Sequence, residues 1–157
     1  MFQRLGFINA NEIREWLVGV EKLLEFEKWN GKVNSSGRKC CWFGKEVELG
    51  FNSKVKNGLK LDRFLVGLGD ENFGMNWNSV LVYKYGVGCE LKDHVDRDVF
   101  FDEVGIINVC KGMVGFKYDG KVFWLKDGEV LWINSKKLHG VLKCGEVRYS
   151  LQFRNVK

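Results

Sequence analysis

Proline is absent from this 157-residue sequence, and histidine occurs only at positions 94 and 139. Turns must therefore be built from its 19 glycines and from Asn and Asp. No run approaches the 18 apolar residues of a membrane-spanning helix, and the N-terminal residues lack the apolar stretch of a signal peptide. We therefore expect a soluble, cytoplasmic protein with no membrane segment.

Cysteine is present but in the wrong pattern for a disulfide framework or a zinc ribbon. The 5 cysteines are odd in number and contain no C-x-x-C pair, which favours reduced thiols in an intracellular protein. The formal charge of +5 permits contact with nucleic acid without establishing it. Hydrophobic content of 45% with 29% charged residues is ordinary for one globular domain, expected over 1–157, and we expect a monomer.

The first 77 residues are expected to hold helices and a short lid. Apolar residues at helical spacing predict an amphipathic helix that begins after Asn9 and ends at Asn30-Gly31, with Glu12 completing a capping box. The segment 31–52 is expected to be a loop with short strands, and a second helix is expected over about 58–69.

From residue 78 onward, short runs rich in Val, Ile, Phe, Tyr and Trp alternate with Gly, Asp and Asn turns. The sequence "FKYDGKVFW" has the Asp-Gly turn of a β-hairpin. Together these patterns predict a mostly β fold with flanking helices (α+β), whose core over 78–157 is a double-stranded β-helix, or jelly roll. The expected strands are 79–87, 91–96, 104–110, 113–118, 121–126, 129–133, 138–143 and 147–154.

The segment "KDHVDRD", residues 92–98, contains an H-x-D pair formed by His94 and Asp96. Residues two apart on an extended chain point the same way, so both side chains can bind one ion. With His139 they would make the two-histidine, one-carboxylate site of non-haem Fe(II) oxygenases. The alternatives at this point are an acidic turn for the pair and a core position for His139.

The last predicted strand, "RYSLQFR", puts Leu151 and Phe153 on one face and Arg148, Ser150 and Arg154 on the other. A buried arginine needs an anion, and no acidic residue lies on this strand. A bound dicarboxylate, gripped by the guanidinium fork, would supply that anion. The alternative is a polar edge that faces solvent.

Taken together, "VLVYKYGVGCELKDHVDRD", "DGEVLWINSKKLHGV" and "RYSLQFR" resemble the AlkB family of Fe(II)/2-oxoglutarate dioxygenases. The resemblance extends more weakly to "GRKCCWFG", which is similar to part of that family's nucleotide-recognition lid. It implies Fe(II), 2-oxoglutarate and O2 as cofactor and cosubstrates. It implies iron ligands His94, Asp96 and His139, and cosubstrate contacts from Tyr85, Arg148, Ser150 and Arg154. Tyr83 and Ser150 stand where the family often has Asn.

The same resemblance implies oxidative demethylation of alkylated bases in DNA or RNA, with release of formaldehyde and succinate. Asp98 would lie at the edge of the target base, and Trp42, Phe43 and Phe51 would offer stacking faces. Phosphate-facing charge is expected from Arg38, Lys39, Lys45, Lys54 and Lys56. The alternatives are a 2-oxoglutarate-dependent hydroxylase of a protein side chain or small molecule, and a non-catalytic cupin-like binding module.

Overall fold

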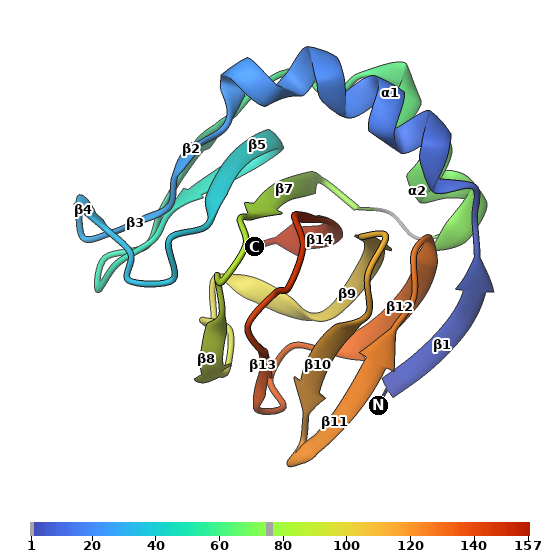
Figure 1. Ribbon diagram of the computed structural model, residues 1–157. Coiled ribbons are helices and arrows are strands. Elements are labelled where there is room, and N and C mark those ends of the chain that lie inside the picture. Colours follow the sequence, from blue (N-terminus) through green and yellow to red (C-terminus); the bar gives the residue numbers. More distant parts are fainter. Residues whose placement is uncertain (1, 75–76) are drawn as a thin grey trace.

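In the computed structural model, which describes residues 2–74 and 77–157, an eight-stranded sheet and a four-stranded sheet enclose a common core (Figure 1). The large sheet has the order β1-β12-β9-β14-β7-β5-β2, with β6 paired to β5, and the small sheet has the order β11-β10-β13-β8. The strands of the large sheet are β1 (Phe2–Phe7), β2 (Glu25–Phe26), β5 (Lys39–Glu48), β6 (Lys54–Asn57), β7 (Ser79–Tyr85), β9 (Phe100–Val109), β12 (Glu129–Asn134) and β14 (Arg148–Val156). Those of the small sheet are β8 (Leu91–His94), β10 (Val114–Tyr118), β11 (Lys121–Leu125) and β13 (His139–Val141).

All eight strands predicted after residue 78 are present, and the jelly-roll prediction is confirmed. The observed strand boundaries differ from the predicted ones by a few residues. Strand β9, for example, begins at Phe100 rather than at 104. The predicted hairpin joins β10 to β11, with Tyr118 opposite Lys121. Its two turn residues, Asp119 and Gly120, have φ values of 50° and 81°, as a two-residue turn with positive φ at both positions requires.

The first helix is shorter than predicted. Helix α1 spans Ala10–Val20 and continues as a single 3-10 turn, η1, over Glu21–Leu23. Asn9 caps it as expected, although its side chain accepts from the amide of Asn11. Beyond the 3-10 turn the predicted helix is wrong, because the chain becomes extended to pair β2 with β5 and to form the small hairpin of β3 (Lys28–Trp29) and β4 (Lys32–Val33). Tertiary pairing here overrides helix propensity.

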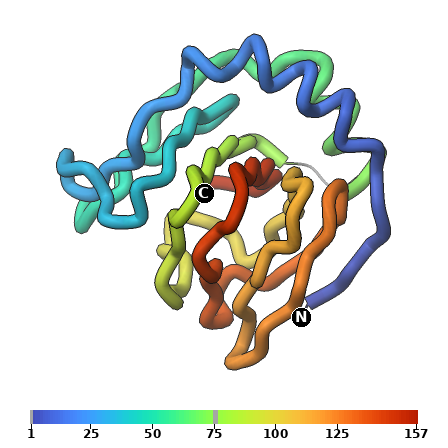
Figure 2. Tube along the Cα trace, viewed as in Figure 1, coloured from blue at the N-terminus to red at the C-terminus, as the bar shows by residue number. Residues whose placement is uncertain are grey.

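Other N-terminal elements also differ from expectation. The second helix, α2, spans Arg63–Asn72 rather than 58–69, because Asp62 caps it by accepting from the amide of Leu65 at 2.9 Å. Strand β5 is ten residues long in a region expected to hold only short pieces. Strand β1 was not predicted. It pairs with β12, more than a hundred residues away in sequence, and Figure 2 shows the blue N-terminal segment running beside the orange one.

Side chains along β7 and β14 point alternately to the two faces of the large sheet, and each face has its own hydrophobic core. Leu151 and Phe153 of β14 point outward, where α1 and α2 cover the large sheet. Tyr85 of β7 points inward toward the small sheet, as do Arg148 and Ser150. The inward face therefore carries the polar groups of a site, and the helices serve to cover the other face. None of the helices within the described residues is long and apolar enough to cross a membrane.

Candidate active site

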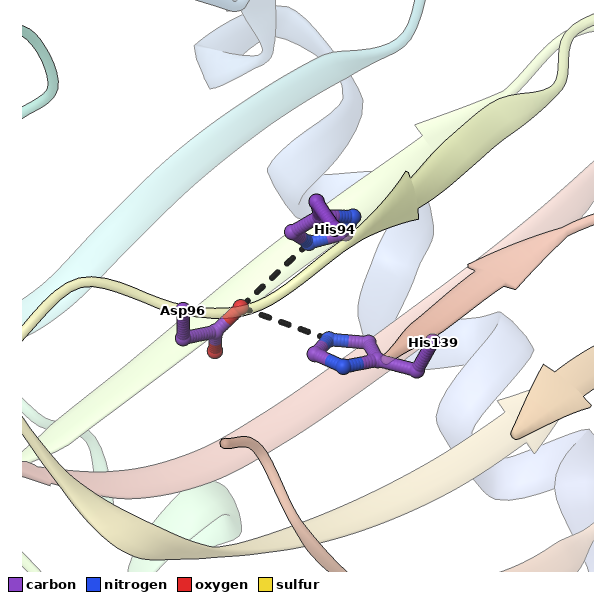
Figure 3. A group of neighbouring side chains, drawn as sticks. All are labelled: His94, Asp96 and His139. Atoms are coloured by element: carbon purple, nitrogen blue, oxygen red, sulfur yellow. Dashed lines mark ion pairs between the residues drawn. The ribbon is translucent and has the colours of Figure 1, made fainter. Parts of the chain in front are cut away.

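Three side chains from the small sheet and its following loop converge at one point (Figure 3). His94 ends β8, His139 begins β13, and the two residues are direct partners across these antiparallel strands. Asp96 follows in the loop after β8, and its Oδ1 lies 3.3 Å from Nε2 of each histidine. One ligand atom from each residue lies within 4.8 Å of the others, so the group could hold a metal ion.

The backbone orients both imidazoles toward that point. Nδ1 of His94 lies 2.9 Å from the carbonyl oxygen of Lys92, and Nδ1 of His139 lies 2.8 Å from that of Lys137. A carbonyl only accepts, so Nδ1 carries the proton and the Nε2 lone pair is directed inward. Two such nitrogens and one carboxylate oxygen on one side of an ion are the donor set that suits non-haem Fe(II).

Asp96 is held as an anion by Arg154. The Arg154 guanidinium donates to Oδ2 of Asp96 at 2.6 Å and lies 3.8 Å from the centre of the Phe100 ring. Burial by itself would raise the pKa of Asp96, but the positive charge of Arg154 outweighs it and holds the pKa well below its usual range. Because Arg154 occupies one carboxylate oxygen, the other is left to face the histidines.

Arg148 lies at the far end of the same cavity, which has a volume of about 590 Å³. Its side chain is 1% exposed, donates from Nε to Oδ1 of Asn108 at 2.8 Å, and has no carboxylate within ion-pair distance among the described residues. The solvent-facing alternative for this strand is therefore excluded. The buried hydroxyl of Ser150 and Nε of Arg154 have no hydrogen-bond partner. A buried cation and unpaired polar atoms fit the binding of a small dicarboxylate.

Asn108 and Glu27 of this site were not predicted from the sequence. Asn108 orients Arg148, and its only signal was a lone amide in the apolar run "VGIINVC". Glu27 lines the cavity, and its only signal was a carboxylate in line with the apolar stripe of the predicted helix, three residues after Leu24.

Arg38 does not face phosphate, so that prediction is wrong. Its side chain is 6% exposed, and it donates from Nε and NH2 to the two carboxylate oxygens of Glu27, at 2.9 and 3.0 Å. Its guanidinium also stacks 3.7 Å from the centre of the Tyr83 ring. The positive charge is thus offset within the protein. Burial by itself would lower the pKa of Arg38, and its tyrosine and glutamate neighbours raise it well above the ordinary value.

The three aromatic residues expected to stack on substrate lie in different places. Trp42 lines the cavity and stacks on Phe100. Phe43 points the opposite way, into the core beneath α1, so its predicted stacking role is wrong. Phe51 is 75% exposed near the cavity mouth, where its ring meets the edge of Trp29. Trp29, which lines the cavity, was not predicted.

The remaining predicted substrate residues lie on the surface. Asp98 is fully exposed, 3.9 Å from the ammonium of Lys136. The same ammonium donates to the carbonyl oxygens of Asp96 and Arg97 and so holds the loop that carries Asp96. The basic side chains at 45, 54 and 56 are exposed on the β5–β6 hairpin, and Lys56 is paired there with Glu46 and Glu48.

The sequence matches no protein-family model and no curated protein. Among solved structures, the chain is similar to OsALKBH1, with 13% identity, a TM-score of 0.76, and coverage of 98% of this chain and 97% of that one. It is also similar to a Pseudomonas putida prolyl-4-hydroxylase, with 16% identity, a TM-score of 0.66, and coverage of 100% and 92%. A third is a 2OG-Fe(II) oxygenase family oxidoreductase from Burkholderia pseudomallei, with 14% identity, a TM-score of 0.64, and coverage of 94% and 79%. The expected AlkB-like 2OG-Fe(II) oxygenase fold is confirmed.

Proposed function

We propose that this protein is an Fe(II)/2-oxoglutarate-dependent dioxygenase. The observation that carries the proposal is one cavity with a His94–Asp96–His139 group near one end and Arg148, without a counter-ion among the described residues, at the other. When bound, Fe(II) and 2-oxoglutarate use O2 to oxidise a substrate C–H bond while 2-oxoglutarate is converted to succinate and CO2.

The chain's own residues bind and orient the cosubstrate and exclude water from the cavity. Arg148, oriented by Asn108, holds the second carboxylate of 2-oxoglutarate by a charge-assisted fork, with Tyr85 and Ser150 beside it. Arg154 keeps Asp96 ionised and turned toward the histidines. The aromatic wall that includes Trp42 keeps the reacting end of the cavity apolar.

The substrate is an alkylated base of DNA or RNA, from which hydroxylation of the N-alkyl group releases formaldehyde. Three observations support this. The site motifs resemble those of the AlkB family, the fold is similar to that of OsALKBH1, and two aromatic side chains that a flipped base could contact, Trp29 and Trp42, line the cavity. Asp98, beyond the metal group and exposed, is available to contact the edge of such a base.

The second candidate is hydroxylation of a protein side chain. The similarity to a prolyl-4-hydroxylase at a TM-score of 0.66 favours it, since the likeness of the two folds extends over the full length of this chain. If the protein hydroxylates a protein side chain, the same cavity would receive an extended peptide rather than a base, and no formaldehyde would form.

The experiment is a screen of succinate formation against methylated DNA and RNA oligonucleotides and against proline-containing peptides. Methylated oligonucleotides should stimulate succinate release with matching formaldehyde, and His139→Ala should abolish both. Stimulation by peptides alone would favour the hydroxylase. Anaerobic addition of Fe(II) and 2-oxoglutarate should give a weak visible charge-transfer band, as expected for a keto acid bound to Fe(II) in such a donor set. If the protein neither bound the metal nor gave this band, both proposals would fail.

A further inference from the structure

A closed network of four buried side chains forms the cavity wall beside the cosubstrate end. Arg38 is at its centre, bonded to both oxygens of Glu27 and to the hydroxyls of Tyr85, at 2.7 Å, and Tyr83, at 3.1 Å. Glu27 follows β2, Arg38 directly precedes β5, and the two tyrosines belong to β7. Glu27 and Arg38 are also joined through their backbones, so the base of the β3–β4 hairpin is clamped at this point.

Hydrogen-bond direction distinguishes the two tyrosines. The Tyr83 hydroxyl accepts from Arg38 and donates to Oε2 of Glu27 at 2.8 Å, so its proton has a partner. The Tyr85 hydroxyl accepts from NH1 of Arg38, and a guanidinium cannot accept in return. The phenolic proton of Tyr85 must therefore point away from Arg38.

Tyr85 lies beside the anion-binding arginine. It is the direct register partner of Arg148 across β7 and β14, and the Arg148 guanidinium lies 4.9 Å from the centre of its ring. Both line the cavity. A phenolic proton turned away from Arg38 is consequently available to an anion held by Arg148.

We propose that Arg38 is a positioning residue for the cosubstrate: by donating to the Tyr85 hydroxyl, it directs the proton of that hydroxyl toward the second carboxylate of 2-oxoglutarate. This inference rests on the proposed function. Arg38 acts through Tyr85 and not through its charge, because Glu27 offsets that charge inside the wall. Glu27 in turn holds the guanidinium in the orientation that reaches Tyr85.

The test measures binding without turnover. Calorimetry with Mn(II) under argon compares 2-oxoglutarate with 2-oxobutyrate, which has the same keto-acid end and no second carboxylate. Arg38→Met alone would leave Glu27 as an unpaired buried charge, so the variant is Glu27→Gln/Arg38→Met, made with and without Tyr85→Phe. The matched control is Arg14→Met, which breaks an ion pair with Asp127 outside the cavity.

We expect the Glu27→Gln/Arg38→Met variant and Tyr85→Phe each to weaken 2-oxoglutarate binding about tenfold, the scale of one hydrogen bond to a charged group. Binding of 2-oxobutyrate should not change, and adding the Glu27 and Arg38 changes to Tyr85→Phe should weaken 2-oxoglutarate no further. Arg14→Met should bind both keto acids as wild type does.

Two results would overturn the inference while leaving the proposed function intact. Additive losses would mean that Arg38 contributes independently of Tyr85. Equal losses for both keto acids would mean that the network only supports the fold. A wild-type protein that bound neither keto acid would instead refute the proposed function itself.

Discussion

From the ion pair of Glu27 and Arg38 we predict the change in the free energy of unfolding that Glu27→Gln causes. Glu27→Gln keeps the size of the side chain and removes its charge, while the Arg38 guanidinium stays buried. The amide nitrogen of the new side chain must replace one carboxylate oxygen. In place of Oε2 it would face two other donors, NH2 of Arg38 at 3.0 Å and the hydroxyl of Tyr83 at 2.8 Å.

An uncompensated buried charge destabilises a protein by about 3–5 kcal/mol. The side chains of this pair are 7% and 2% exposed, so solvent screens the loss little. For a domain of this size that corresponds to a fall in melting temperature of roughly 10 °C. Urea unfolding and calorimetry measure the two quantities.

Two control variants separate pairing from other effects. Glu48→Gln removes a carboxylate from a pair with Lys56 whose side chains are 53% and 50% exposed, and it should change stability by less than about 1 kcal/mol. Glu27→Gln/Arg38→Met removes both buried charges and should recover most of the lost stability. The reasoning is refuted if the free energy of unfolding of Glu27→Gln lies within about 1 kcal/mol of that of wild type, or if the double variant is no more stable than Glu27→Gln.

Three further predictions concern single side chains. Asn108→Ala leaves Nε of buried Arg148 without its acceptor and should weaken 2-oxoglutarate binding about tenfold or more in calorimetry with Mn(II); unchanged affinity would contradict the role of Asn108. Asp98→Ala should alter which methylated base is accepted in the oligonucleotide screen without preventing metal binding, and an identical substrate profile would show that Asp98 does not contact the base. Burial raises the pKa of Cys40 to about 12. At pH of about 9.5, where a free thiol is mostly ionised, iodoacetamide should therefore label Cys40 far more slowly in the folded protein than in the unfolded one; stability should fall as pH rises above about 8.5, and equally fast labelling of the two forms would contradict the raised pKa.

Much of the fold, and the nearness of His94 to Asp96, could be predicted because their signals are local. Strands of the jelly roll show alternation and are separated by Asp-Gly turns, both of which act within a few residues. The pair of His94 and Asp96 is equally local, since the spacing alone puts both side chains on one side of an extended chain. The arginines on the polar side of β14 indicated a buried anion site. Leu151 and Phe153 place the other face of that strand in the core, so a buried arginine on the polar side would need an anion.

What the sequence could not decide depends on contacts between distant residues. In "CCWFG" Trp42 and Phe43 are both apolar, so no alternation of polar and apolar residues shows which of them faces the cavity. In the structure Trp42 lines the cavity and Phe43 packs beneath α1. Arg38 in isolation carries the charge of a phosphate contact, and Glu27 in isolation is one more residue of the predicted helix. Only the tertiary structure ends that helix early and brings the two charges together beneath Tyr83. A buried charge is costly without its partner, and nothing in the local sequence of either residue indicates that the other is near.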